Sequence, residues 1–414
     1  MIHASKYQPR IYPVNGLGSP SEIDRAQSIE PAASLNRTKV EEIGNDQIVG
    51  YTKQSPSVTY RLTQLEYGSM EFWRKVTNKE DAVNAISLGD FKTPTFDIAS
   101  FLTDDDGTYR GTLWYPGLRC SGFGINIGDP EATIERTFDF VGEAAIQWQG
   151  ANKYVIYVEH DAGAGAVDTV DLSANLPAID PDVPASKTDA EKYLYRVVRI
   201  RSGVSIELDL SVDCTYSTIT DDITIVDVQA NDVFKVWHTS AVAPSTIFTP
   251  NTIDVSALSA DSVSIYLYIP GSGSPSTGDY LYRMQSVGFD VTFDREDKKE
   301  IGNKNVVQRG VNTNTVSVSL NDILEKFTVG EALRGEVVNY GKLDVEKLTD
   351  KATLIVKVFE DNTKTTLKYG FKTDNLSPTD VSNGAGVNAY VTGDKSLESD
   401  NLIITTDNNQ LGNL

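Results

Sequence analysis

The chain has little of the chemistry that enzymes and metal proteins usually show in their sequences. Only 2 cysteines, 3 histidines and 3 methionines occur among its 414 residues. Cys120 and Cys214 lie far apart and in no metal-type spacing, which argues against a disulfide framework and predicts two buried, small hydrophobic side chains. His160 stands between Glu159 and Asp161, and a single triplet of this kind favours a solvated strand end over a metal site.

Sequence motifs of catalysis are also missing. There is no Gly-x-Ser-x-Gly nucleophile elbow and no phosphate-binding Gly-x-x-x-x-Gly-Lys loop. The glycine-rich segment 271–279 precedes a predicted strand, so it presents no helix N-terminus to phosphate. The Asp-Asp-Asp-Gly run at 104–107 lacks the distal Glu of a calcium loop and predicts a turn. We therefore predict a structural protein rather than an enzyme, with no cofactor and no metal, although the paired carboxylates of β-rich hydrolases leave no such trace.

Long apolar runs are absent as well. No stretch approaches the roughly 18 consecutive apolar residues of a membrane helix, and the N-terminus has no apolar run behind its basic residues. The sequence therefore predicts a soluble protein that is made in a reducing cytoplasm and has no membrane partner.

Basic residues are fewer than acidic residues. Lys+Arg number 37 against 58 Asp+Glu, which gives a formal net charge of −21. This balance argues against tight, salt-dependent binding of nucleic acid, which needs clustered cations. An acidic surface would suit a channel through which DNA passes without being held, and solubility alone is the simpler interpretation of the same charge.

The residues that are present favour β-strands. Tyr (19) and Phe (14) are plentiful, and Val, Ile and Thr recur in short runs. The hydrophobic fraction of 40% and charged fraction of 23% are typical of a globular protein, and the length predicts two to three domains.

One motif occurs twice. Residues 27–66 align with residues 285–324 without a gap, at a constant offset of 285 − 27 = 258. Both copies contain Gln-Ser near their start and Glu-Ile-Gly-Asn further on. The identical pairs are Gln27/Gln285, Ser28/Ser286, Arg37/Arg295, Glu42/Glu300, Ile43/Ile301, Gly44/Gly302, Asn45/Asn303, Val49/Val307, Val58/Val316 and Leu62/Leu320.

Within each copy the pattern predicts a strand, a turn, a loop and a second strand. Gly and Asn of Glu-Ile-Gly-Asn tolerate positive φ and so predict the turn. The polar segments 46–57 and 304–315 are longer than a tight hairpin needs and predict loops that contact a partner. Apolar residues then alternate with polar ones, as expected for a strand with one buried face. The alternating apolar positions are Val58, Tyr60 and Leu62, and Val316, Val318 and Leu320.

A short helix is expected after the alternating strand of each copy. In the first copy, Ser69 would cap a helix that carries Phe72, Trp73 and Val76. In the second copy, Asn321 or Asp322 would cap a helix that carries Ile323, Leu324 and Phe327. We expect these apolar side chains to pack in the core.

The similarity extends to whole domains. Upstream, residues 11–12 match 265–266; downstream, 104–119 match 360–374 and 136–143 match 388–395. The predicted domains are therefore a first copy over residues 1–150 and a second copy over 256–414. Residues 151–255 have no counterpart, and their strand-like runs between Ala/Gly- and Pro-rich segments predict a small β domain or insertion.

The order of these elements resembles that of the tail tube (major tail) proteins of long-tailed bacteriophages. The segment 284–310, MQSVGFDVTFDREDKKEIGNKNVVQRG, carries the resemblance most clearly, and the first copy follows the same order. The resemblance covers most of residues 1–150 and 256–414.

This resemblance implies a mainly β chain with two tail-tube-like β-sandwich domains, each with a short flanking helix, and a smaller middle β domain that decorates or bridges them. Such domains join edge to edge into a ring whose inner wall is a continuous β-barrel. The family's usual ring has six single-domain subunits, so a chain with two domains implies a homotrimeric, pseudo-hexameric ring. Stacked rings would form the channel for DNA ejection in the virion tail. The implied partners are the chain itself and the tail tape-measure, tail-tip and tail-terminator proteins.

The motif residues are expected to have distinct roles. The shared scaffold positions are Gln27, Arg37, Glu42, Gly44 and Asn45, and Gln285, Arg295, Glu300, Gly302 and Asn303. The candidates for contacts between stacked rings are Asp46, Gln47, Tyr51 and Lys53 in the first loop, and Lys304, Asn305, Arg309 and Asn312 in the second.

Two other functions remain open at this point. An inner-tube protein of a contractile injection system would share the fold and carry effectors instead of DNA. A multi-domain β-sandwich adhesin or carbohydrate-binding protein belongs to a different class, and it would need a secretion signal or an anchoring tail.

Overall fold

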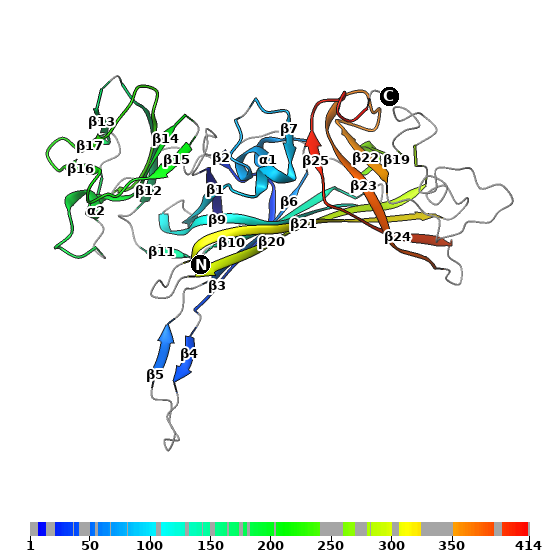
Figure 1. Ribbon diagram of the computed structural model, residues 1–414, viewed down its shortest axis with the longest axis horizontal. Coiled ribbons are helices and arrows are strands. Elements are labelled where there is room, and N and C mark those ends of the chain that lie inside the picture. The colour runs from blue at the N-terminus through cyan, green and yellow to red at the C-terminus, as the bar shows by residue number, and fades with distance from the viewer. Residues whose placement is uncertain are drawn as a thin grey trace, which may run out of the picture.

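The computed structural model is mainly β (Figure 1). The residues it describes are 7–13, 21–35, 37–40, 50–53, 57–66, 68–80, 82–104, 109–128, 132–142, 144–149, 154–163, 165–173, 177–179, 183–202, 204–240, 260–269, 280–281, 283–299, 306–323, 351–384 and 391–412. They form a 16-stranded sheet, a four-stranded sheet, a three-stranded sheet and a two-stranded sheet. The prediction of a mainly β chain is confirmed.

The residues before 150 supply the first part of the large sheet. The strands are β1 (Tyr7–Pro13), β2 (Ser21–Glu22), β3 (Ala26–Ser34), β6 (Ser57–Leu65), β7 (Ala85–Ser87), β8 (Phe96–Thr103), β9 (Tyr109–Ile127), β10 (Glu135–Gly142) and β11 (Ile146–Gln149). Helix α1 (Glu71–Val76) and the 3-10 helix η2 (Leu88–Phe91) follow β6, and the separate hairpin of β4 (Arg37–Val40) and β5 (Gly50–Lys53) projects away from the body.

The residues after 260 supply the rest of the large sheet. The path through it runs β19-β22-β23-β24-β21-β20-β9-β10-β6-β3, so one sheet continues from the second half of the chain into the first. The elements are the 3-10 helix η4 (Ala260–Ser262), β19 (Val263–Tyr268), β20 (Met284–Lys299), β21 (Val306–Ile323), β22 (Ala352–Phe359), β23 (Leu367–Gly384), β24 (Thr392–Ser399) and β25 (Ile403–Thr405).

The intervening residues form two small sheets with a core of their own. The orders are β12-β18-β14-β15 and β13-β17-β16. Their apolar core includes Val197, Ile223 and Phe234, and Cys214 lies in it as predicted from its isolation in the sequence. The elements are β12 (Tyr154–Asp161), β13 (Val167–Asp171), α2 (Asp189–Tyr193), β14 (Leu194–Arg201), β15 (Val204–Glu207), β16 (Cys214–Ser217), β17 (Asp222–Val226) and β18 (Val233–Ser240).

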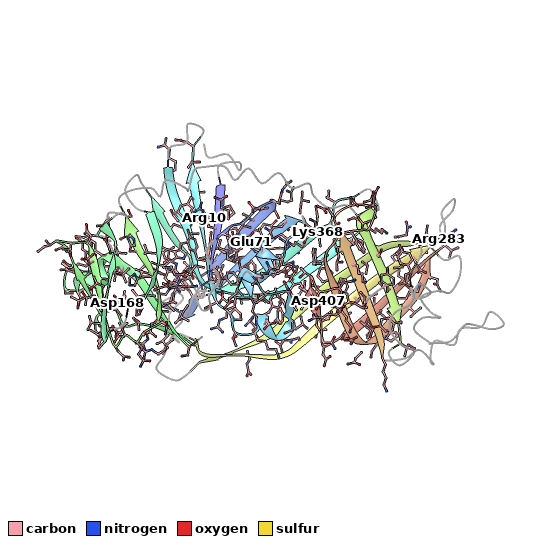
Figure 2. All side chains as sticks on the ribbon, turned by 90° about the horizontal axis from the view of Figure 1, so that it is seen from above. Arg10, Glu71, Asp168, Arg283, Lys368 and Asp407 are labelled. Carbon is pink, nitrogen blue, oxygen red and sulfur yellow. The ribbon has the colours of Figure 1, made fainter. Side chains whose placement is uncertain are left out.

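This middle region packs on the first half. Arg196 of β14 forms a buried ion pair with Asp97 of β8, and its guanidinium lies 4.6 Å from the ring centroid of Trp237. The Asp97 carboxylate also accepts from Trp114 Nε1 at 3.1 Å, so the pair is held in place by hydrogen bonds. Figures 1 and 2 agree that the three regions lie in a row, with the middle region at one end.

Strand pairing follows the same order in the two halves. The first half pairs β1-β8-β9-β10-β6-β3, and the second half pairs β19-β22-β23-β24-β21-β20. The registers correspond residue by residue: Arg37 pairs with Lys53 and Arg295 pairs with Val311, and both differences, 295 − 37 and 311 − 53, equal 258. The constant offset of the sequence repeat is thus also an offset in strand register.

Irregularities recur at the same places. A β-bulge makes Ser121 an extra residue in β9, and its hydroxyl donates to Asp139 O at 3.0 Å. A bulge makes Thr379 an extra residue in β23, and its hydroxyl donates to Ser396 O at 3.1 Å. Bulges are specific features of a backbone, so their recurrence is more informative than strand order alone.

A rare backbone conformation recurs too. Arg25 (φ 55°) and Arg283 (φ 62°) both lie in the left-handed region that non-glycine residues seldom adopt. Each of their carbonyls accepts a hydrogen bond of 3.1 Å, from Leu65 N and Ile323 N respectively. These pairs are again separated by 258 residues.

Two details of the predicted domain alignment are wrong. Ile98 pairs with Tyr115 and Leu354 pairs with Thr373, and 373 − 115 = 258, so Ile98 corresponds to Leu354. Ile11 lies opposite Ile98 and Leu267 lies opposite Leu354, so Ile11 corresponds to Leu267 and not to Ile265. Residues 136–143 correspond to 393–400, in and just beyond β24, and not to 388–395. Short loops of unequal length separate these strands, and similarity of a few residues does not fix such offsets.

The alternating strands are confirmed. Val58, Tyr60 and Leu62 are buried, as are Val316, Val318 and Leu320. The first predicted helix also exists, but it begins at Glu71 with Met70 at the cap position. The Ser69 hydroxyl accepts a hydrogen bond from Glu71 N at 3.1 Å.

The predicted cap of the second helix is wrong. Asn321 and Asp322 pair with β24 within β21, so they continue the strand instead of starting a helix. The remainder of that segment, 324–350, lies outside the described residues.

Candidate assembly surface

The repeated Gln-Ser marks a bulge. The register shifts between Ala26 and Ser28 in β3, and between Met284 and Ser286 in β20, which leaves Gln27 and Gln285 as the extra residues. Both glutamines are exposed. Their role is therefore in the backbone path of the sheet, which the sequence motif did not show by itself.

The two repeated arginines have different surroundings. Arg295 donates to backbone carbonyls of the first half: Nε to Cys120 O at 2.7 Å, Nη2 to Phe91 O at 3.0 Å and Nη1 to Lys92 O at 3.1 Å. Arg37 occupies the same register position in the projecting hairpin, is exposed, and makes no hydrogen bond or ion pair within the described part of the chain. One copy of the motif thus anchors the junction between the halves, and the other is open.

The predicted polar loops are largely strands. Tyr51 and Lys53 lie in β5, and Arg309 and Asn312 lie in β21, so the loop assignment is wrong at these residues. The mixed polar sequence of these segments has no apolar alternation, so the pattern alone does not indicate a strand. The motif and loop residues outside the described part of the chain are Glu42, Gly44, Asn45, Asp46, Gln47, Glu300, Gly302, Asn303, Lys304 and Asn305.

One face of the continuous sheet packs on the core, and the opposite face is polar. The buried face carries residues such as Phe123, Phe138 and Val291. Because side chains alternate along a strand, their neighbours point the other way. The charged side chains of this open face, taken by register across β3, β6, β10, β9, β20, β24 and β23, are the acidic Glu30, Glu135, Asp139, Asp290, Asp380, Asp394 and Glu398 and the basic Arg61 and Arg119.

The acidic groups of this open face influence one another. Burial raises the pKa of Asp139, the Arg61 guanidinium lowers it, and the Asp290 carboxylate raises it. Asp139 and Asp290 pair with Gly122 and Gly124 on the intervening strand, which places the two carboxylates on either side of β9. Two carboxylates therefore lie where the two halves meet, and Arg61 balances one of them, with its Nε 3.8 Å from the Asp139 carboxylate.

Two strand segments of the large sheet each have an unpaired edge in the described part of the chain. Within the described residues, β3 pairs with β6 alone, and the 377–384 part of β23 pairs with β24 alone. The corresponding edges inside the chain, on β20 and β9, pair with each other from Val287–Ile127 to Thr292–Gly122. An unpaired strand edge presents backbone donors and acceptors to another strand.

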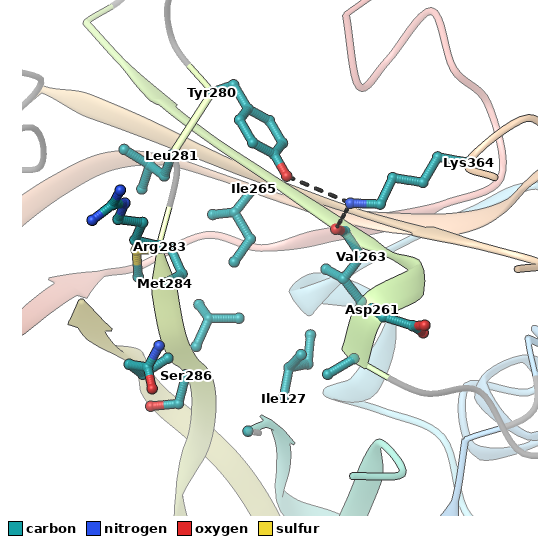
Figure 3. Close-up of a pocket in the computed structure, with 14 residues that line it drawn as sticks. Ile127, Asp261, Val263, Ile265, Tyr280, Leu281, Arg283, Met284, Ser286 and Lys364 are labelled. Atoms are coloured by element: carbon teal, nitrogen blue, oxygen red, sulfur yellow. Dashed lines mark hydrogen bonds between the residues drawn. The ribbon is translucent and has the colours of Figure 1, made fainter. Parts of the chain in front are cut away.

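A small pocket lies where β9 ends and the second half begins (Figure 3). The Lys364 ammonium points to it but already donates to Val263 O at 2.7 Å and to the Tyr280 hydroxyl at 3.5 Å. Ile127, Leu281 and other apolar side chains make up much of the remaining wall. The arrangement is one of packing between two elements and contains no nucleophile joined to a base.

The described residues include no group of three or more His, Cys, Asp or Glu side chains arranged to hold a metal ion. His160 instead lies with Nε2 3.1 Å from the Asp168 carboxylate, within the middle region. None of the helices in the described ranges combines the length and apolar character that crossing a membrane requires.

No protein-family model matches the chain, and no curated protein matches it.

Proposed function

We propose that this protein is the subunit of a bacteriophage tail tube, in which three chains form a pseudo-hexameric ring and stacked rings form the channel for DNA ejection. The observation that carries the proposal is the open face: the sheet from β3 to β23 is continuous, polar and acidic on its uncovered side, and among the described residues β3 and the 377–384 part of β23 each have one unpaired edge.

The two halves are inferred to be copies of one tail-tube-like domain. Common strand order, a constant register offset, matching bulges and a shared left-handed arginine support this inference. A duplicated chain supplies two ring positions at once, and its halves meet head to tail through β9 and β20. Head-to-tail contacts generate a ring when the rotation closes.

Closing the sheet into a barrel would remove both free edges. The path β3-β6-β10-β9-β20-β21-β24-β23 contributes eight strands per chain, so three chains contribute 3 × 8 = 24. A barrel of this size encloses an open lumen, because barrel diameter grows with strand number. The open face then lines the lumen and the apolar core lies outside it.

The charge of that lining suits DNA as cargo. Carboxylates outnumber guanidinium groups on the open face, so the wall repels phosphates on balance, and its few cations do not form the cluster that tight DNA binding needs. The chain would therefore conduct DNA without binding it. The tail tape-measure, tail-tip and tail-terminator proteins would be its partners in the virion, and the middle region would decorate the outside of the tube.

Electron microscopy with mass measurement tests the proposal. We expect rings of three chains that stack into tubes when the purified protein is concentrated. A protein that stays monomeric at every concentration and salt condition would contradict the proposal. Rings of six chains would contradict the assignment of two ring positions to each chain.

A further inference from the structure

We propose that a second copy of this chain adds its β3 to the free edge of β23, in the register that β20 and β9 already use within the chain, and that Arg37 anchors this contact. The inference deepens the proposed ring by assigning its chain-to-chain seam. It rests on two free edges, and it does not depend on what the ring conducts.

The internal junction supplies the template. Strands β9 and β20 pair antiparallel over six residue pairs, from Val287–Ile127 to Thr292–Gly122. The offset of 258 residues relates β20 to β3 and β9 to β23. Subtracting 258 from each β20 residue number and adding 258 to each β9 residue number therefore gives the register that β3 and β23 would have in the seam. The pairs are Glu30–Gly384, Pro31–Asn383, Ala32–Ser382 and Ala33–Val381. In each pair, the first residue belongs to β3 of one chain and the second to β23 of the next chain.

The matching side chains at the seam are smaller and more polar than those of the template. Val287, Phe289 and Val291 are buried in the internal junction, whereas their counterparts are Ile29, Pro31 and Ala33. On the facing strand, Phe123 and Ile125 correspond to Val381 and Asn383. The seam therefore buries less apolar surface than the internal junction, which favours chains that are separate when dilute and associate when concentrated.

Two local features limit the length of the seam. A Cβ on Gly122 would lie 2.8 Å from Val291 O, and the counterpart of Gly122 is Asp380. The strands must therefore open at Asp380, which confines close pairing to residues 30–33. Pro31 has no backbone N–H, and a proline on an exposed edge also discourages uncontrolled strand addition.

Arg37 is the polar anchor of the seam. Its counterpart Arg295 reaches across the internal junction to Cys120 O at 2.7 Å, and the residue that corresponds to Cys120 is Pro378, beside the free edge of β23. Arg37 is exposed and has no partner among the described residues of its own chain. The geometry assigns the Pro378 carbonyl of the next chain as its acceptor.

Cysteine cross-linking tests the register. The double variant Ala32→Cys with Ser382→Cys places the two thiols opposite each other across the seam, at the Cβ separation of directly paired residues, about 4.5–5.5 Å. The native cysteines are buried and give little background. We expect covalent dimers and trimers on a non-reducing gel after mild oxidation.

The matched control shifts one thiol by a single residue. In Ala32→Cys with Asn383→Cys, the second thiol points to the opposite face of the sheet, so we expect at most a tenth of the cross-linking. Equal cross-linking of the two double variants would overturn the register.

Arg37→Ala tests the anchor. We expect the concentration needed for half-assembly to rise about tenfold or more, because hydrogen bonds from a charged donor are lost. The melting temperature of the dilute monomer should not change. The control is Arg110→Ala, another exposed arginine, which pairs with Asp104 away from the seam and should leave assembly unchanged. Equal effects of the two variants would remove Arg37 from the seam.

The outcomes separate this inference from the proposed tube. Rings without cross-linking of residues 32 and 382 would overturn the seam and leave the tube in place. Cross-linked open chains that never close or stack would support the seam and overturn the tube. A protein that neither cross-links nor assembles would overturn both.

Discussion

The two halves of the chain share a backbone plan and differ in how they bury charge beneath the sheet. In the first half, Arg136 pairs with Glu66 at 2.9 Å, and its guanidinium lies 5.6 Å from the centroids of both Phe72 and Trp73. In the second half, Lys395 pairs with Asp322. Bulges and registers are retained while the buried pair is rebuilt, so the backbone pairing is the part that both halves require.

The internal junction and the free edges likewise share a strand arrangement and differ in their side chains. Arg295 donates to three backbone carbonyls across a junction of large apolar residues. Arg37 is exposed, and the β3 edge that precedes it in the chain carries smaller residues. One surface is permanently closed by covalent connection and packing. The other keeps the motif arginine and the strand path but has smaller apolar residues and a proline at position 31, as the proposed seam between chains would require.

Substitutions in the buried ion pairs should change the free energy of unfolding most, and they should affect the two halves differently. Arg136→Met should lower the free energy of unfolding by about 3–5 kcal/mol, because it leaves the Glu66 carboxylate buried without its cation. Lys395→Met should cost less, because no aromatic ring among the described residues lies over Lys395, whereas Arg136 lies over three. Denaturant unfolding of both variants measures this, and a larger loss for Lys395→Met would contradict the ranking.

The middle region, which has no counterpart, should respond to acid. Burial lowers the pKa of His238 from 6.5 to about 4, so the unfolded chain takes up a proton first as the pH falls. Stability is then lost between about pH 6.5 and pH 4, and it is regained as the pH rises through that window. The difference, 6.5 − 4, corresponds to at most about 3 kcal/mol.

The variant His238→Gln identifies the group responsible for that loss. Its unfolding free energy should change less between pH 6.5 and pH 4 than that of the parent, measured by urea titration at each pH. His160→Gln is the control, because His160 is only partly buried. Identical pH profiles for parent and His238→Gln would assign the acid sensitivity to other groups.

Removing the two motif arginines should separate the closed junction from the open edge. Arg295→Ala should destabilise the monomer by about 1.5–3 kcal/mol, since it leaves buried carbonyls without a charged donor. Arg37→Ala should change monomer stability by less than about 0.5 kcal/mol. Thermal unfolding at low concentration measures both, and similar losses would mean that Arg37 already has a partner within its own chain.

Of the substitutions expected to destabilise the monomer, the one at the junction glycine should have the smallest effect. Gly122→Ala should cost about 1–3 kcal/mol, because the new Cβ meets the Val291 carbonyl at 2.8 Å. Asp380→Ala, at the matching position of the free edge, should leave the monomer within about 0.5 kcal/mol of the parent. If Gly122→Ala is neutral in the same unfolding assay, β9 and β20 pair less closely than described.

Local patterns predicted the elements that local physics controls. The alternation at Val58, Tyr60 and Leu62 required a strand with one buried face, and the structure has it. The gapless offset of 258 predicted equivalent positions, and strand registers follow it through both hairpins. Segments without alternation are less predictable: Tyr51 and Arg309 lie in strands, but the polar sequence around them has no apolar period that indicates a strand.

The sequence by itself determined the repeat, the β character and the acidic charge, because these depend on residue type and spacing alone. Only the tertiary structure decided that β9 joins β20, that Arg295 anchors that junction and that Asp97 receives Arg196 from the middle region. These contacts join residues about 100 to 200 positions apart in the chain, and their choice depends on which edges remain free once the local elements have formed.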